Sequence, residues 1–202
     1  MKPELAATIY VDPTCPFAWI TSLWLNEVAT KTGLQVQREL MSLSVVNEGR
    51  ELEAWYRDYN DRAWRPARVA AGLLASPHAH RWSDFYEAFG RRRHIEGLSD
   101  DIRNITLTLD GLGLPAGLAD AAEDEGWDND LRRRTATAMA PLSSDGGTPA
   151  LHIGGRGFFG PVLTAVPRGD DAVRLWEAVS ILATTDAFSE IKGIRHEQLQ
   201  TS

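Results

Sequence analysis

The sequence predicts an α/β fold that is interrupted by a large all-helical insertion. Runs rich in β-branched and aromatic residues, which favour strands, are concentrated in residues 6–40 and 148–160 of the 202-residue chain. Between them, apolar side chains recur at the three- and four-residue spacing of amphipathic helices. We therefore expect a first α/β segment over residues 1–48, the insertion over 49–143 and a second α/β segment over 144–202.

The first α/β segment is expected to form a strand, a helix and a second strand. Residues 6–11 form an apolar run that stops at the turn signal Asp12-Pro13. After Cys15, apolar side chains recur at helical spacing, at Ile20, Leu23, Trp24 and Val28. Residues 34–40 then alternate between apolar and polar with a period close to two. Because a helix connects them, the two strands are expected to be parallel.

Several helices are expected in the insertion. Aromatic side chains form one stripe in residues 52–59, which include Trp55, and another in residues 82–89; both stripes are expected to face the core. Helical spacing continues over residues 65–74, where Pro66 signals a break. Shorter helices are expected at residues 100–112, 115–125 and 128–139.

The second α/β segment is expected to form a β-hairpin followed by a helix. Two short apolar runs, residues 148–153 and 157–160, flank the pair Gly154-Gly155, which is typical of a tight turn. Residues 171–183 then carry apolar side chains, including Trp176, on one helical face. The complete order is strand–helix–strand, helical insertion, strand–strand–helix.

Charge and hydropathy exclude several classes of function. A formal net charge of −7 argues against a nucleic-acid-binding protein. No apolar run approaches the length that spans a membrane, and the first apolar run is too short and too strand-like for a signal sequence. We therefore expect a cytoplasmic protein with neither nucleic-acid nor membrane partners. The sequence leaves open whether it is a monomer or a homodimer.

The position of Cys15, the single cysteine of the chain, predicts a reactive thiol. It lies between a strand and a helix, where unpaired backbone N–H groups and the positive end of the helix dipole stabilise a thiolate. Pro16 suits the first turn of a helix, because its missing N–H costs little there. A single cysteine cannot form an intramolecular disulfide, and the five histidines show no ligand spacing, so no metal is expected.

The order of the elements, with Cys15-Pro16 at the first helix and Thr148-Pro149 before the hairpin, resembles the thioredoxin-like fold of the DsbA family. The resemblance implies that the bond between Thr148 and Pro149 is cis. It also implies that the backbone beside this bond pairs with an extended or peptide-like thiol substrate. In such a fold Cys15 is the expected catalytic nucleophile, rather than the small buried apolar residue that a lone cysteine usually is.

Five motifs make a closer resemblance, which spans nearly the whole chain: residues 12–22, 41–43 with 47–48, 62–64, 147–149 and 158–163. In this order they resemble actinobacterial mycothiol-dependent nitroreductases, also described as mycoredoxin-like proteins. The resemblance implies mycothiol or another low-molecular-weight thiol as co-substrate, and a disulfide or electrophilic small molecule as substrate. The residues expected to bind them are Pro16, Phe17, Trp19, Asn47, Trp64, His94, Thr148 and Pro149.

Position 18 separates this chain from that family. The family has Cys-Pro-Trp-Cys, whereas this chain has Cys15-Pro16-Phe17-Ala18. A dithiol enzyme clears a mixed disulfide by attack of its second cysteine, and Ala18 cannot make that attack. We therefore expect monothiol chemistry, in which Cys15 attacks a disulfide that carries mycothiol and a second low-molecular-weight thiol releases it.

Two other functions stay open. Kappa-class glutathione transferases and hydroxychromene carboxylate isomerases share this architecture and position a bound thiol without a two-cysteine motif. A non-catalytic binding or chaperone-like module is the third reading of the sequence. An ordinary Cys15 pKa, near the free-cysteine value of about 8.5, would favour that third reading.

Some candidate residues also have structural explanations. Trp19 and Trp64 are equally suited to a core. His94 follows the run Arg91-Arg92-Arg93, which is typical of a solvated helix face. Asp12 is expected to be a turn or capping residue rather than a proton shuttle.

Overall fold

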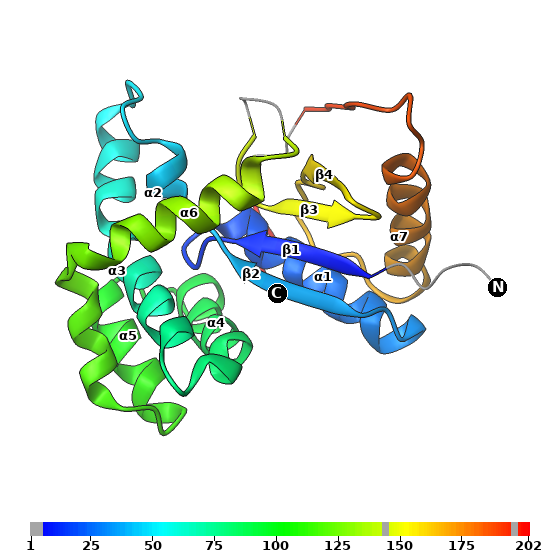
Figure 1. Cartoon of the computed structure of the whole chain (residues 1–202). Helices are drawn as coiled ribbons and strands as arrows, with labels where there is room; N and C mark the ends of the chain where they lie inside the picture. The colour runs from blue at the N-terminus through cyan, green and yellow to red at the C-terminus, as the bar shows by residue number, and fades with distance from the viewer. Residues whose placement is uncertain (1–5, 143–145, 195–197) are drawn as a thin grey trace. The chain divides into compact units, whose positions relative to one another are not determined.

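The computed structural model describes residues 6–142, 146–194 and 198–202 (Figure 1). Its elements confirm the predicted α/β class with an all-helical insertion between the strands. Within those ranges, no helix combines the length and the apolar character that crossing a bilayer requires.

The chain forms two compact units. In their described residues, the sheet unit comprises Met1–Val11, Pro16–Glu39 and Ala138–Ser202, and the helical unit comprises Asp12–Cys15 and Leu40–Thr137. The short segment that contains Cys15 therefore groups with the helical unit, although strand and helix of the sheet unit flank it in the chain. The expected boundary between residues 143 and 144 lies outside the described residues.

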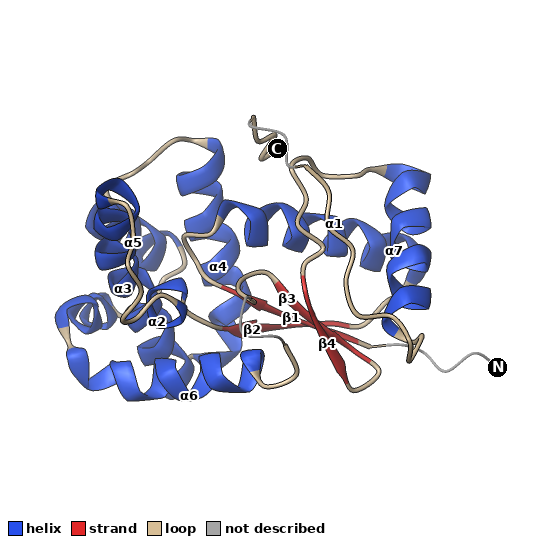
Figure 2. Ribbon diagram, turned by 90° about the horizontal axis from the view of Figure 1, so that it is seen from above, coloured by secondary structure: helices blue, strands red, loops and turns tan. Residues whose placement is uncertain are grey.

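The sheet unit contains a four-stranded sheet in the order β2-β1-β3-β4, drawn in red in Figure 2. Its strands are β1 (Ala7–Val11), β2 (Val36–Leu40), β3 (Ala150–Ile153) and β4 (Arg156–Phe159). Strand β3 is antiparallel to both β1 and β4. Along β1, Ala7, Ile9 and Val11 are fully buried and the residues between them are half-buried, as the alternation of side chains on a central strand requires.

The predicted hairpin between β3 and β4 is confirmed. Ile153 pairs with Arg156, which leaves Gly154 and Gly155 as the two turn residues. Their φ angles are 59° and 82°, the left-handed values that a two-residue hairpin turn of this kind requires at both positions. Glycine adopts these values without steric cost, so the local sequence determines this turn.

Two helices pack against each other in the sheet unit, α1 (Pro16–Thr32) and α7 (Gly169–Ala183). The indole N–H of Trp24 donates a hydrogen bond to the Ala172 carbonyl at 3.0 Å, and its ring centre lies 6.2 Å from that of Trp176. Both tryptophans are buried, which confirms the core role expected for Trp176. Helix α1 begins at Pro16, so Cys15 immediately precedes its first turn.

The helical unit is built from five α-helices and several shorter turns. The α-helices are α2 (Leu43–Val46), α3 (Ala54–Ala75), α4 (Trp82–Gly90), α5 (Asp101–Gly111) and α6 (Asp128–Met139), the last of which ends in the sheet unit. Short 3-10 helices are η1 (Ala79–Arg81), η3 (Ala116–Glu123) and η4 (Glu125–Trp127), and η2 (Arg91–Ile95) is a π-helical turn. The predicted aromatic stripe of α4 is confirmed as core, because Trp82, Phe85, Tyr86 and Phe89 are all buried.

Three predictions for this unit are wrong. Helix α3 continues through Pro66, which is one of its buried residues, so the break that proline signals does not occur. Residues 115–125 form 3-10 turns rather than one α-helix. Trp55 is 68% exposed, because it lies in the first turn of α3, where its indole N–H donates to the Glu53 carboxylate at 2.7 Å.

Candidate functional site

Cys15 lies at the end of a tight turn. The turn is closed by the Cys15 N–H, which donates to the Asp12 carbonyl at 3.1 Å. The side chain is only 3% exposed, and the next residue, Pro16, is the first of α1. The predicted sequence of strand, turn and helix start around the cysteine is therefore confirmed.

The buried carboxylate of Asp12 accepts the hydrogen bonds that hold this turn. One carboxylate oxygen accepts hydrogen bonds from the N–H and the hydroxyl of Thr14, both at 2.7 Å, and the other accepts from the N–H of Leu43 at 2.7 Å. Burial raises the pKa of Asp12, while these three donors and the charge of Arg93 act in the opposite direction. The expected role of Asp12 as a turn residue is confirmed.

Two side chains of the helical unit hold the backbone that precedes Cys15. The phenol hydroxyl of Tyr59, on α3, donates to the Thr14 carbonyl at 2.7 Å. The His94 ring, on η2, forms a hydrogen bond with the backbone of Pro13, whose only polar backbone group is its carbonyl. The structure thus brings His94, a predicted site residue, to the cysteine turn and adds Tyr59 beside it.

The electrostatic surroundings keep both side chains uncharged. Burial, followed by the positive charge of Arg93, lowers the pKa of His94 to about 3, so the imidazole is neutral near pH 7. Burial raises the pKa of Tyr59, and the negative charges of Asp12 and Cys15 add to that shift. Both groups therefore act as neutral hydrogen-bond donors to backbone carbonyls.

Arg93 links these groups. Its guanidinium lies over the Tyr59 ring, 5.7 Å from the ring centre, and pairs with the carboxylate of Asp101. Both members of the pair are largely buried, with side-chain exposures of 14% and 5%. The run Arg91-Arg92-Arg93 is typical of a solvated helix face, and for Arg93 this expectation is wrong, because its side chain is largely buried against Asp101. In the described part of the chain, no three His, Cys, Asp or Glu side chains gather closely enough to hold a metal ion.

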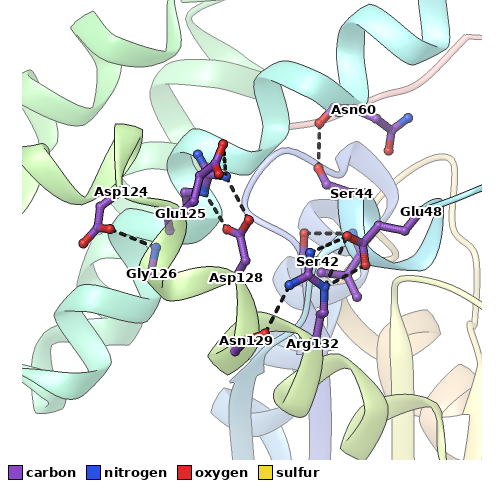
Figure 3. A network of polar contacts seen from close by, with 12 residues as sticks. Ser42, Ser44, Glu48, Asn60, Asp124, Glu125, Gly126, Asp128, Asn129 and Arg132 are labelled. Carbon is purple, nitrogen blue, oxygen red and sulfur yellow. Dashed lines mark hydrogen bonds and ion pairs between the residues drawn. The ribbon is translucent and has the colours of Figure 1, made fainter.

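Asn47 belongs to a polar network at the end of α2. Its side-chain amide donates to the Asn60 side-chain oxygen at 2.9 Å and to the Tyr56 hydroxyl at 3.3 Å. Asn60 in turn accepts a hydrogen bond at its backbone carbonyl from the Ser44 hydroxyl, at 2.6 Å (Figure 3). These bonds tie α2 to α3 on the helical unit.

Trp64 is half-buried, and two guanidinium groups lie near its ring. Arg68 and Arg132 lie 5.3 and 5.8 Å from the ring centre. Each arginine is held by a carboxylate: Arg68 by Asp128, through bonds of 2.7 and 3.0 Å, and Arg132 by Glu48, at 2.6 Å (Figure 3). The Arg68–Asp128 pair joins α3 to α6 beside Trp64.

The remaining predicted site residues belong to the sheet unit. Pro16 and Phe17 are half-buried in the first turn of α1, whereas Trp19 is buried and its indole N–H donates to the Thr201 carbonyl at 2.9 Å. The bond between Thr148 and Pro149 is cis. The Thr148 hydroxyl donates to the Tyr10 carbonyl at 3.3 Å, and the Pro149 carbonyl accepts from the Gly160 N–H at 2.8 Å.

Sequence reasoning missed Tyr59 as a site residue. Its spacing places it in the apolar stripe of residues 52–59, although a buried tyrosine hydroxyl usually needs a hydrogen-bond partner. The need for a partner predicts that the Tyr59 hydroxyl forms a hydrogen bond. It does not identify the partner, because the Thr14 carbonyl lies 45 residues away in the chain.

The comparison with protein families finds one that spans most of the chain. Residues 14–193 match the family model "Rv2466c-like: Mycothiol-dependent nitroreductase Rv2466c". A relative from Mycobacterium tuberculosis, the uncharacterized protein Rv2286c, is 32% identical over 178 residues, which cover 86% of this chain and 75% of that protein.

Solved structures show the same architecture. A 2-hydroxychromene-2-carboxylate isomerase matches with a TM-score of 0.59 and 14% identity over 86% of this chain and 93% of that one. The cytosolic disulfide reductase DsbM from Pseudomonas aeruginosa, with GSH, matches with a TM-score of 0.56 and 17% identity over 86% and 98%. A probable DsbA oxidoreductase from Streptomyces coelicolor has a TM-score of 0.51 and 14% identity, over 94% of both chains.

These likenesses confirm the thioredoxin-like fold with a helical insertion that was predicted from the order of the elements. Together with the family match, they support a thiol-dependent redox function. The chain belongs to the Rv2466c-like family of mycothiol-dependent nitroreductases.

Proposed function

We propose that this protein is a monothiol thiol–disulfide oxidoreductase that uses Cys15 and a low-molecular-weight thiol, with mycothiol as the first candidate. The observation that carries the proposal is the combination at the start of α1: the single cysteine directly precedes the helix, and Ala18 stands where the family has its second cysteine. The helix start favours a thiolate, and alanine cannot resolve a mixed disulfide.

The proposed cycle has two exchange steps. In the first, the Cys15 thiolate attacks one sulfur of a disulfide; a Cys15–sulfur bond forms, the substrate S–S bond breaks, and the other half leaves as a thiolate that takes a proton from water. In the second, a low-molecular-weight thiolate attacks the sulfur bound to Cys15. This attack forms a new small-molecule disulfide and returns Cys15 as a thiolate. Each cycle therefore releases one half of the substrate disulfide as a thiol, consumes one external thiol, and leaves the other half joined to that external thiol.

The same external thiol would be needed for an electrophilic substrate such as a nitro compound. Each two-electron reduction consumes two thiols and yields one disulfide, and this chain has one cysteine to contribute. The proposed co-substrate is therefore required for every turnover, whichever oxidant is reduced.

The test follows the exchange of mycothiol disulfide with a second thiol by chromatography, with glutathione disulfide in a parallel reaction. We expect the wild-type protein to accelerate the exchange and Cys15→Ser to abolish the acceleration. A preference for mycothiol disulfide over glutathione disulfide would support mycothiol as the co-substrate. Equal rates with and without the wild-type protein would refute the proposal.

An isomerase or transferase that acts on a bound thiol is the second candidate, favoured by the match to the 2-hydroxychromene-2-carboxylate isomerase structure. In that mechanism the side chain at position 15 positions a thiol instead of exchanging electrons. Thiol-dependent isomerisation or conjugation that survives in Cys15→Ser would therefore favour the second candidate. If Cys15 reacts with no disulfide and no alkylating reagent, that result would instead favour a non-catalytic binding module.

A further inference from the structure

Two consecutive peptide planes lead into Cys15, and each is held at both ends. In the Pro13–Thr14 peptide, the carbonyl is bonded by His94 and the N–H donates to the Asp12 carboxylate at 2.7 Å. In the Thr14–Cys15 peptide, the carbonyl accepts from Tyr59 at 2.7 Å and the N–H donates to the Asp12 carbonyl at 3.1 Å. Each peptide therefore has little freedom to rotate.

The Thr14–Cys15 peptide matters most for the thiol. A rotation of this plane about the Thr14 Cα–C bond carries the Cys15 Cα and its side chain along, because that Cα belongs to the plane. Tyr59 bonds the carbonyl of this plane, so its hydroxyl resists the rotation that would displace the Cys15 side chain. The Tyr59 ring is itself fixed, with Arg93 5.7 Å from its centre and the Tyr56 ring stacked at 5.9 Å.

We propose that Tyr59 is a positioning residue for the Cys15 thiol, acting through the Thr14 carbonyl, with His94 acting in the same way through the Pro13 carbonyl. This inference rests on the proposed function only in taking Cys15 as the reactive group. It assigns to the helical unit the task of fixing the nucleophile that precedes the first helix of the sheet unit. Neither residue needs to touch the substrate to do so.

Tyr59→Phe tests the proposal, because it removes the hydroxyl and keeps the ring. Tyr56→Phe is the matched control: it lies on the same helix, its ring stacks on Tyr59, and its hydroxyl bonds Asn47 rather than the cysteine turn. The measurement is the pH dependence of Cys15 alkylation by iodoacetamide, read by intact mass. Asp12, Arg93 and His94, which also face this turn, are unchanged in both variants.

We expect Tyr59→Phe to move the alkylation midpoint toward the free-cysteine value of about 8.5 and to slow alkylation at pH 7 by about threefold to tenfold. Tyr56→Phe is expected to keep the wild-type midpoint. A purely structural role would lower the melting temperature of Tyr59→Phe and leave the midpoint in place, and that result would overturn the proposal. A wild-type midpoint already near 8.5, or a Cys15 that is never alkylated, would overturn it too.

If Tyr59→Phe does not fold, a pair of His94 variants takes its place. Gln retains an N–H that can donate to the Pro13 carbonyl, whereas Leu does not. We expect His94→Leu to raise the midpoint and His94→Gln to keep it; equal midpoints in the two variants would overturn the proposal.

The result is separable from the proposed function. A midpoint that depends on Tyr59 in a protein that exchanges no disulfide would refute the function and keep the positioning role. If the wild-type protein and Tyr59→Phe exchange disulfides at the same rate and share the same alkylation midpoint, the positioning role is refuted and the proposed function stands.

Discussion

The carboxylate of Asp12 accepts a hydrogen bond from the Leu43 N–H at 2.7 Å, which joins the turn that holds Cys15 to the first residue of α2. The same carboxyl accepts two further bonds from Thr14. Because Asp12 is fully buried, its removal leaves these donors without an acceptor in a site that water does not reach.

We predict that Asp12→Ala lowers the free energy of unfolding by about 2–4 kcal/mol, the cost of several unsatisfied buried donors. Urea denaturation followed by circular dichroism measures the change. Asp61→Ala is the control, because Asp61 is exposed on α3 and should change stability by less than about 0.5 kcal/mol. Equal effects of the two substitutions would show that the Asp12 bonds contribute nothing.

The lowered pKa of His94 predicts acid sensitivity. Its pKa is about 3 in the folded protein and 6.5 for an ordinary histidine, so between these values the unfolded chain binds the additional proton. Neutral His94 therefore makes its full contribution to the free energy of unfolding above pH 6.5, and this contribution is lost as the pH falls from 6.5 toward 3. From pH 7 to pH 4.5 the loss is about 2 kcal/mol.

Urea denaturation at several pH values checks this prediction. His94→Gln, which does not titrate, should flatten the pH dependence of stability over that range relative to the wild-type protein. Parallel curves for the two proteins would show that His94 titrates alike in the folded and unfolded chains.

We predict that Ala18→Cys restores dithiol chemistry. The introduced thiol lies three residues after Cys15, at the spacing of the family motif. After reaction with a small disulfide, this variant should expel the bound thiol without any added thiol and form an intramolecular disulfide, whereas the wild-type adduct should persist. Intact mass distinguishes the two products; a stable adduct on the variant would contradict the prediction.

The two arginines that flank Trp64 should contribute very differently to stability. Arg68 and Asp128 have side-chain exposures of 11% and 13%, so Arg68→Met strands a nearly buried carboxylate and should cost about 2 kcal/mol or more. Arg132 and Glu48 are 45% and 40% exposed, and solvent screens their attraction. Glu48→Ala should therefore cost at most about 0.5 kcal/mol. Chemical denaturation of both variants measures their free energies of unfolding. Similar losses for Arg68→Met and Glu48→Ala would contradict this ranking.

The predictions that the structure confirms depend on local rules. The pair Gly154-Gly155 determines the hairpin because a two-residue turn requires φ values that glycine adopts freely. Pro16 begins α1 because proline suits the first helical turn. The burial of Phe85 and Phe89 follows from their helical spacing alone.

The features that the sequence does not predict have no local pattern. Proline signals a break at Pro66, yet helix α3 continues through this buried residue. The bond from Tyr59 to Thr14 spans 45 residues, and no local pattern reports it. The resemblance implies His94 as a site residue, but neither the π-helical turn that contains it nor its hydrogen bond with Pro13 has a local signal in the sequence.

Intact mass spectrometry of the reduced protein after incubation with mycothiol disulfide tests the central claim most directly. The account predicts one mycothiol adduct on Cys15, no adduct on Cys15→Ser, and complete release of the wild-type adduct when a second low-molecular-weight thiol is added. An unmodified wild-type protein, under conditions in which a control thiol protein is modified, would contradict the claim that Cys15 is the nucleophile of a monothiol cycle.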